Sequence, residues 1–165
     1  MGANIYPSVI FINDKRVTTA FIHDLLIYNC NFKLEGIEVK SANKVKHDIF
    51  DIKYPEINNI SLSLCSRIGS SGTIGHTITP CLVYHIDIIV NTKDDLSYVF
   101  EVEPTLKILD LIKYIKNLNI DLLDKFKIEE LLVNVDNISI FNDYMANNFE
   151  NLAKEYNLDN PRKKY

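Results

Sequence analysis

The clearest pattern in the chain lies between residues 82 and 118, where strand-like alternation gives way to helical spacing. Apolar side chains occupy every second position of two segments that flank the polar stretch 91–95. Because successive side chains of a strand point to opposite faces, this alternation predicts an antiparallel hairpin over residues 82–103. The inward positions are Tyr84, Ile86, Ile88 and Val90 in the first strand, and Leu96, Tyr98, Phe100 and Val102 in the second.

The period changes after Pro104. Proline ends a strand and fits the first turn of a helix, where a missing N–H costs nothing. Apolar residues then recur three and four positions apart, which predicts a helix over residues 105–118. Its apolar stripe contains Ile108, Leu111, Ile112 and Ile115.

The rest of the chain divides into a β-rich half and a helical end. Short apolar runs at 9–12, 32–39 and 57–66 predict strands, with turns at Asn13-Asp14 and Glu35-Gly36. Residues 17–28 fit either a strand or a helix. Two stripes of helical spacing follow, over residues 128–135 and 138–156.

These elements predict an α+β fold. We expect a bent antiparallel sheet, or a partly open barrel, closed by the helix at 105–118 and followed by a helical C-terminal extension. The predicted domain boundaries are 1–120 for the β-rich domain and 121–165 for the extension.

The order of elements over residues 8–118 resembles that of pleckstrin-homology-like (PH-like) domains, which small bacterial proteins also carry. The likeness rests on the alternating segments 84–90 and 96–102 and on the helix that starts at Thr105. It implies that the helix plugs one end of a strongly bent barrel, and that the domain binds lipids, peptides or proteins. Lipid-binding members use cations near the first hairpin loop. Here Lys15 and Arg16 stand beside Asp14, so we do not expect lipid headgroup binding.

Composition narrows the class of protein. The net charge is −4 and the pI is near 5.5, which disfavours binding to nucleic acid phosphates. No apolar run reaches the ~20 residues of a membrane span. The first residues lack the pattern of a signal peptide, and the three cysteines have no C-x-x-C spacing. We therefore expect a cytoplasmic protein with reduced thiols, and the resemblance to PH-like domains of bacteria implies a bacterial source.

Residues 66–77 hold three of the five glycines and predict a mobile loop between two strands. The backbone N–H groups and hydroxyls of such a loop can cradle an anion. Arg67, Ser70, Ser71 and His76 are therefore candidate ligand-binding residues. The alternative is a solvent-exposed hairpin loop without a ligand.

We expect a non-catalytic binding or protein-interaction module whose partner is another protein or a second copy. Phe141, Met145 and Phe149 on the last helical stripe are candidate interaction residues. In the alternative, which we favour, this stripe packs against the protein's own core.

The competing hypothesis is a small metal-dependent or hydrolytic enzyme that uses His76, His85 and Asp87. Against it, the histidines are scattered and no cysteine pair has ligand spacing, so we expect no metal, no cofactor and no catalytic residue. His85 and Asp87 then form the polar outer face of a strand, and Glu101 and Glu103 are solvated charges. A third hypothesis is a small-ligand pocket inside the barrel, lined by Tyr84, Tyr98 and Phe100.

Overall fold

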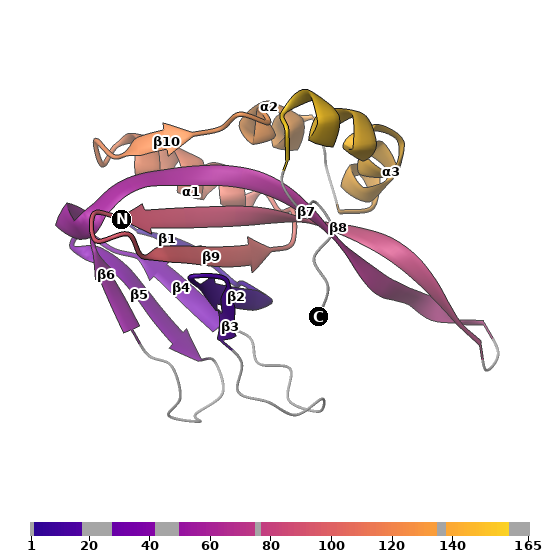
Figure 1. Cartoon of the computed structure of the whole chain (residues 1–165), viewed down its shortest axis with the longest axis horizontal. Coiled ribbons are helices and arrows are strands. Elements are labelled where there is room, and N and C mark those ends of the chain that lie inside the picture. Colours follow the sequence, from indigo (N-terminus) through magenta and orange to yellow (C-terminus); the bar gives the residue numbers. More distant parts are fainter. Residues whose placement is uncertain (1, 18–27, 42–49, 75–76, 135–137, 159–165) are drawn as a thin grey trace.

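Two β-sheets enclose one hydrophobic core (Figure 1). The computed structural model of the chain describes residues 2–17, 28–41, 50–74, 77–134 and 138–158. Within these ranges the protein has an α+β fold, as the sequence predicts. Of the ambiguous segment 17–28, only Val17 and Tyr28 are described, and both belong to strands. Residues 18–27 lie outside the described ranges, so the choice between strand and helix stays open there.

The first sheet is antiparallel, with strand order β1-β4-β5-β6. Its strands are short, and the buried side chains of β4 alternate with half-buried ones, as expected of a sheet with one face on the core. The turn predicted at Glu35-Gly36 joins β4 to β5, with the Lys33 N–H donating to the Gly36 carbonyl at 2.9 Å. The strands are β1 (Ala3–Ile5), β4 (Tyr28–Phe32), β5 (Gly36–Ser41) and β6 (Phe50–Lys53).

The second sheet has the order β10-β7-β8-β9-β2-β3 and is antiparallel except for the pairing of β10 with β7. A short 3₁₀ turn, η1 (Tyr54–Glu56), leads the chain from the first sheet into the second. Among the described residues no strand pairing joins the two sheets, so they do not close a barrel. The strands are β2 (Val9–Ile12), β3 (Lys15–Val17), β7 (Ile57–Ile74), β8 (Thr77–Thr92), β9 (Ser97–Val102) and β10 (Asp121–Leu123).

The hairpin predicted over residues 82–103 is confirmed as the antiparallel pair β8–β9. Of the eight positions expected to point inward, Ile86 and Phe100 are fully buried, whereas Leu96 and Tyr98 are half-buried. Ile88 lies directly opposite Phe100 on the neighbouring strand and is also fully buried. The alternation of the sequence therefore identifies the inner face of this sheet correctly.

All three helices within the described residues agree with the predicted stripes. Helix α1 (Lys107–Lys116) buries the four apolar residues expected of it and packs against β1. Helix α2 (Ile128–Val133) begins where the Asp124 carboxylate accepts hydrogen bonds from the backbone N–H groups of Ile128 and Glu129, at 2.8 and 3.0 Å. Helix α3 (Ile138–Glu155) packs against β8. The region after residue 120 thus shares the core of the β-rich region, and β10 adds a strand to its sheet.

Strands β7 and β8 extend far beyond the sheet and form a two-stranded arm, which projects away from the body in Figure 1. Strand β9 pairs with β8 only from Ile86 to Asn91, and β10 pairs with β7 only from Asn59 to Ser61. We use the name arm for residues 68–74 and 77–82. The prediction of a long loop at 66–77 is wrong, because β7 continues to Ile74. Backbone pairing with the opposite strand extends the ladder through a glycine-rich sequence that alone favours a loop.

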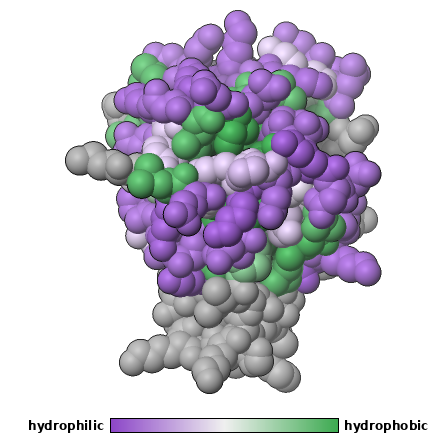
Figure 2. Space-filling model, turned by 90° about the vertical axis from the view of Figure 1, so that its left-hand side faces the viewer, coloured by the Kyte–Doolittle hydropathy of each residue, from purple (hydrophilic) through white to green (hydrophobic). Residues whose placement is uncertain are grey.

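No helix within the described ranges is both long and apolar enough to cross a lipid bilayer. Figure 2 shows the end of the molecule opposite the arm, where hydrophilic residues cover most of the surface and apolar ones form small separate areas. Among the residues coloured in this view, no broad apolar face is visible.

Candidate functional site

A cluster of five polar residues is buried at the root of the arm. We call this group, Cys65, Arg67, His85, Asp87 and Glu101, the buried polar cluster. Its members come from β7, β8 and β9 and occupy odd-numbered positions, so they share the face of the sheet opposite to Ile86 and Phe100. The strand register places Cys65 opposite His85, and Asp87 opposite Glu101.

An ion pair between Arg67 and Glu101 is the main interaction of the cluster. The guanidinium donates from Nε to one carboxylate oxygen of Glu101 and from Nη2 to the other. Both side chains are almost completely removed from solvent, with relative exposures of 2% and 0%. The Arg67 guanidinium also lies over the ring of Phe11, 5.8 Å from its centre, which adds a cation–π contact.

The remaining three side chains surround this ion pair. The Cys65 thiol donates a hydrogen bond to Asp87 Oδ1 at 3.5 Å. His85 Nδ1 lies 3.8 Å from Glu101 Oε1, beyond hydrogen-bond distance. Among the residues that the structure describes, His85 Nδ1 has no hydrogen-bond partner.

Burial lowers the pKa of His85, because the charged imidazolium would lose its hydration. The carboxylate of Glu101 acts in the opposite direction, and the guanidinium of Arg67 lowers the pKa further. The ring of His85 is therefore neutral at neutral pH, and one of its nitrogens carries a lone pair.

This arrangement corrects the expectation that Glu101 is a solvated charge and that His85 and Asp87 form an exposed strand face. Glu101 is fully buried, and His85 and Asp87 are 9% and 4% exposed. Glu101 tolerates burial because Arg67, from a strand two positions away in the sheet, supplies the matching charge. Glu103 is exposed, as expected. His85 and Asp87 therefore lie beneath the surface of the described structure rather than on it.

The four predicted ligand-binding residues do not form one site within the described structure. Arg67 belongs to the buried polar cluster, with its side chain turned into the protein. Ser70 and Ser71 lie on the extended backbone of β7, and His76 lies outside the described residues. The glycine-rich segment therefore provides no loop of converging N–H groups among its described residues.

The three predicted interaction residues lie in the protein's own core. Phe141 and Met145 are fully buried, and Phe149 is 3% exposed with its ring centre 5.0 Å from that of Tyr84. The alternative in which helix α3 covers the sheet is thus the arrangement observed. These side chains can reach a partner only if α3 leaves the sheet.

Each of the three residues proposed to line an interior pocket, Tyr84, Tyr98 and Phe100, packs against a neighbouring side chain or is fully buried in the described structure. Tyr84 packs on α3, Phe100 is fully buried, and Tyr98 stacks on Phe50 with ring centres 5.4 Å apart. Protein interiors packed in this way leave little space for a ligand.

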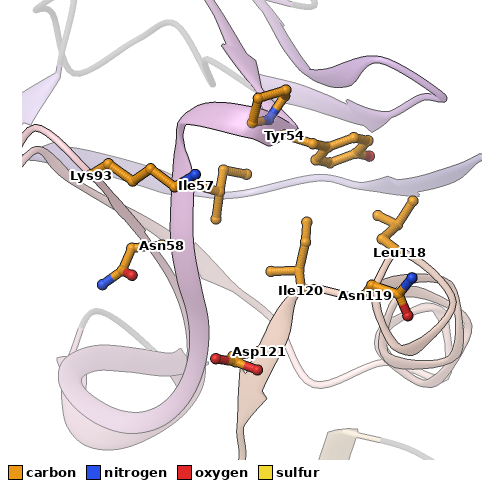
Figure 3. A pocket seen from close by; sticks show the side chains of 9 residues that line it. Tyr54, Ile57, Asn58, Lys93, Leu118, Asn119, Ile120 and Asp121 are labelled. Carbon is orange, nitrogen blue, oxygen red and sulfur yellow. The ribbon is translucent and has the colours of Figure 1, made fainter.

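A separate hollow of about 350 Å³ lies between the turn η1 and the start of β10 (Figure 3). Lys93 and Asp121 provide one charge of each sign at its wall, so neither an anion nor a cation is clearly favoured. Burial raises the pKa of Tyr54, whose hydroxyl stays neutral. The lining residues are Tyr54, Pro55, Ile57, Asn58, Lys93, Leu118, Asn119, Ile120 and Asp121.

Sequence reasoning missed Cys65 and Glu101 as members of one site with His85 and Asp87. The four residues come from three strands, so no fixed spacing along the chain marks them. The usable signal was the alternation itself, which places all four residues on one face once the pairings of β7 with β8 and of β8 with β9 are known. Comparison with family models, curated proteins and solved structures gives no match for this chain.

Proposed function

We propose that this chain is a non-catalytic interaction module that associates with a second copy of itself through the arm. The observation that carries the proposal is the edge of the arm, which pairs with no further strand among the described residues, together with its exposed apolar side chains. Ile68 and Leu82 lie directly opposite each other, and they are 72% and 40% exposed. An isolated two-stranded ribbon is marginally stable in water, so a further strand stabilises it.

The composition of the arm favours a second copy over a charged partner. No Asp, Glu, Lys or Arg occurs between residues 68 and 86. Proteins usually place charges, above all lysine, on exposed strand edges to prevent pairing with other chains. In a two-fold dimer each surface meets itself, so a neutral edge associates without repulsion between like charges.

The edge of β7 is the better candidate for this pairing. On β8, the N–H of Tyr84 points away from β7 and donates to Asn142 Oδ1 at 3.2 Å. The backbone groups of Leu82 and Pro80, two and four residues earlier, point away from β7 in the same way as those of Tyr84. Pro80 has no N–H to donate at this edge. The edge of β7 carries no proline from Ile68 to the end of the strand, so we place the contact along β7 at Ile68.

The test is the molecular mass in solution over a range of concentrations, by sedimentation or light scattering. We expect a reversible monomer–dimer equilibrium that Ile68→Lys and Leu82→Lys shift towards the monomer. Leu34→Lys is the matched control, because Leu34 is 81% exposed and lies off the arm. A wild-type protein that stays monomeric at all concentrations overturns self-association.

Hydrogen exchange locates the contact. In the dimer, backbone amides near Ile68 should gain protection as the concentration rises, whereas those of α1 should not change. Protection confined to another surface would move the interface away from the arm.

The PH-like resemblance stays a prediction, and it is compatible with this proposal because that architecture often serves protein binding. The cytoplasmic location likewise remains an expectation from the sequence.

A further inference from the structure

The buried polar cluster brings together three atoms that can bind a metal ion. Cys65 Sγ and one carboxylate oxygen each from Asp87 and Glu101 lie within 4.8 Å of one another, and all three residues are buried. Each comes from a different strand of one sheet, so the backbone holds the three ligands in place. Distances of this size need only small side-chain movements to surround an ion.

His85 supplies an independent observation that points to the same site. It is about nine-tenths buried, and its Nδ1 faces Glu101 Oε1 at 3.8 Å without a hydrogen-bond partner among the described residues. A buried polar atom without a partner is costly, and coordination of a metal would satisfy it. Because burial keeps the ring neutral, its nitrogen lone pair is available at neutral pH.

The charges of the metal-bound cluster balance. A Cys65 thiolate and the carboxylates of Asp87 and Glu101 carry three negative charges. A divalent ion and the Arg67 guanidinium carry three positive charges, and His85 is neutral. The ion pair with Arg67 does not prevent coordination, since each carboxylate oxygen has two lone pairs. A neutral sum matters here because uncompensated charge in a buried site is expensive.

We propose that Cys65, His85, Asp87 and Glu101 bind a divalent transition metal at the root of the arm. The mixture of one sulfur, one nitrogen and two oxygen ligands fits Zn²⁺ and excludes Mg²⁺ and Ca²⁺, which prefer oxygen ligands alone. His85 is not among the three atoms that lie within 4.8 Å of one another, so its ring must move towards the ion on binding. The four ligands then fill a tetrahedral site, which makes the ion structural. Binding releases the thiol proton of Cys65 and replaces its hydrogen bond to Asp87 with coordination.

The first test is titration of the full chain, free of any affinity tag and stripped with chelator, with Co²⁺ as a spectroscopic probe. We expect one equivalent of Co²⁺ to give the absorption bands of a tetrahedral site and a thiolate-to-cobalt charge-transfer band. Zn²⁺ should displace the cobalt and remove these bands. Absence of the charge-transfer band in the wild-type protein overturns the proposal.

Variants then assign the ligands. Cys65→Ser should abolish the charge-transfer band, whereas Cys81→Ser should leave it, because Cys81 lies on the arm and outside the cluster. A band that survives Cys65→Ser and disappears with Cys81→Ser refutes the assignment.

His85→Gln provides a second readout in case Cys65→Ser does not fold. We expect it to weaken Zn²⁺ affinity at least about tenfold. His76 was a candidate metal ligand in the enzyme hypothesis from the sequence but is not a ligand in this proposal. His76→Gln should therefore leave the Zn²⁺ affinity unchanged. The unfolding temperature of the wild-type protein should rise with Zn²⁺ and not with Mg²⁺. Equal affinities for His85→Gln and the wild type would exclude His85 as a ligand and overturn the four-residue site.

Discussion

The body of the second sheet and the arm are built from the same two strands, yet their surroundings are opposite. In the body, β9 pairs with β8, and side chains of β7 and β8 are buried on both faces of the sheet. In the arm, β7 and β8 pair only with each other among the described strands, and Ile68 is mostly exposed. The comparison teaches that the hydrogen-bonded pairing of two strands can continue beyond the point where their side chains are buried. The contribution of a strand to stability must therefore be assigned separately for each of its segments.

The strongest test of this comparison sets a body residue against an arm residue. Phe100→Ala should destabilise the protein by about 3–5 kcal/mol, because it empties a fully buried site opposite Ile88. Ile68→Ala should change the free energy of unfolding by less than about 0.5 kcal/mol at low protein concentration, where the arm is exposed. Denaturant unfolding of both variants provides the measurement. Similar losses for the two would show that the arm belongs to the cooperative core.

A second test concerns the root of the arm, where the face of the second sheet opposite to Phe100 buries polar side chains instead of apolar ones. Glu101→Gln removes the charge that balances Arg67 in a buried position, and we expect a loss of about 3 kcal/mol. Glu103→Gln is the matched control, since Glu103 is exposed two residues further along the chain. Its unfolding free energy should stay within about 0.5 kcal/mol of the wild type. A Glu101→Gln variant as stable as the Glu103→Gln variant would show that the ion pair contributes nothing.

The smallest expected effect is a dependence of stability on pH. Burial lowers the pKa of His85 in the folded protein. As the pH falls, His85 of the unfolded chain is therefore protonated near pH 6.5, about the ordinary pKa of histidine, whereas His85 of the folded protein is protonated only at a lower pH. The unfolded state then binds more protons, and stability falls as the pH drops below that value; above it, the contribution is fully present. Charged groups around His85 are Glu101, Arg67, Glu103 and Asp87.

Unfolding free energies of the metal-free protein, measured with chelator at about pH 7.5 and pH 5.5, check this prediction, because a metal bound at His85 would add its own pH dependence. His85→Gln should flatten the dependence over this range. If the variant loses as much stability in acid as the wild type, another group is responsible.

Local sequence patterns predicted most strands and helices of the body, because the alternation or helical spacing of each element is visible in its own residues. The alternation at 84–90 and the helical spacing after Pro104 reflect only which face of the element is buried against the core. The strand and the helix that they predict are both confirmed. The stripe on α3 was also visible, and the structure shows that it covers the sheet.

Two features could not be predicted, for different physical reasons. Glycine and serine at 69–72 favour a loop locally, whereas pairing with the opposite strand keeps β7 extended. The burial of Glu101 depends on Arg67, 34 residues earlier in the chain, so nothing in the local sequence reports it. In both cases the deciding partner lies on another strand.

The position of α3 has a consequence for the synthesis of the chain. Tyr84 is covered by Phe149, and the N–H of Tyr84 donates to Asn142, so both contacts come from the helix made last among the described elements. While the ribosome is still adding that helix, β7 and β8 have already emerged with an apolar face uncovered. Nascent chains in this state are exposed to aggregation, and this one stays so until α3 has been made. This part of the core can therefore be completed only once α3 has left the ribosome.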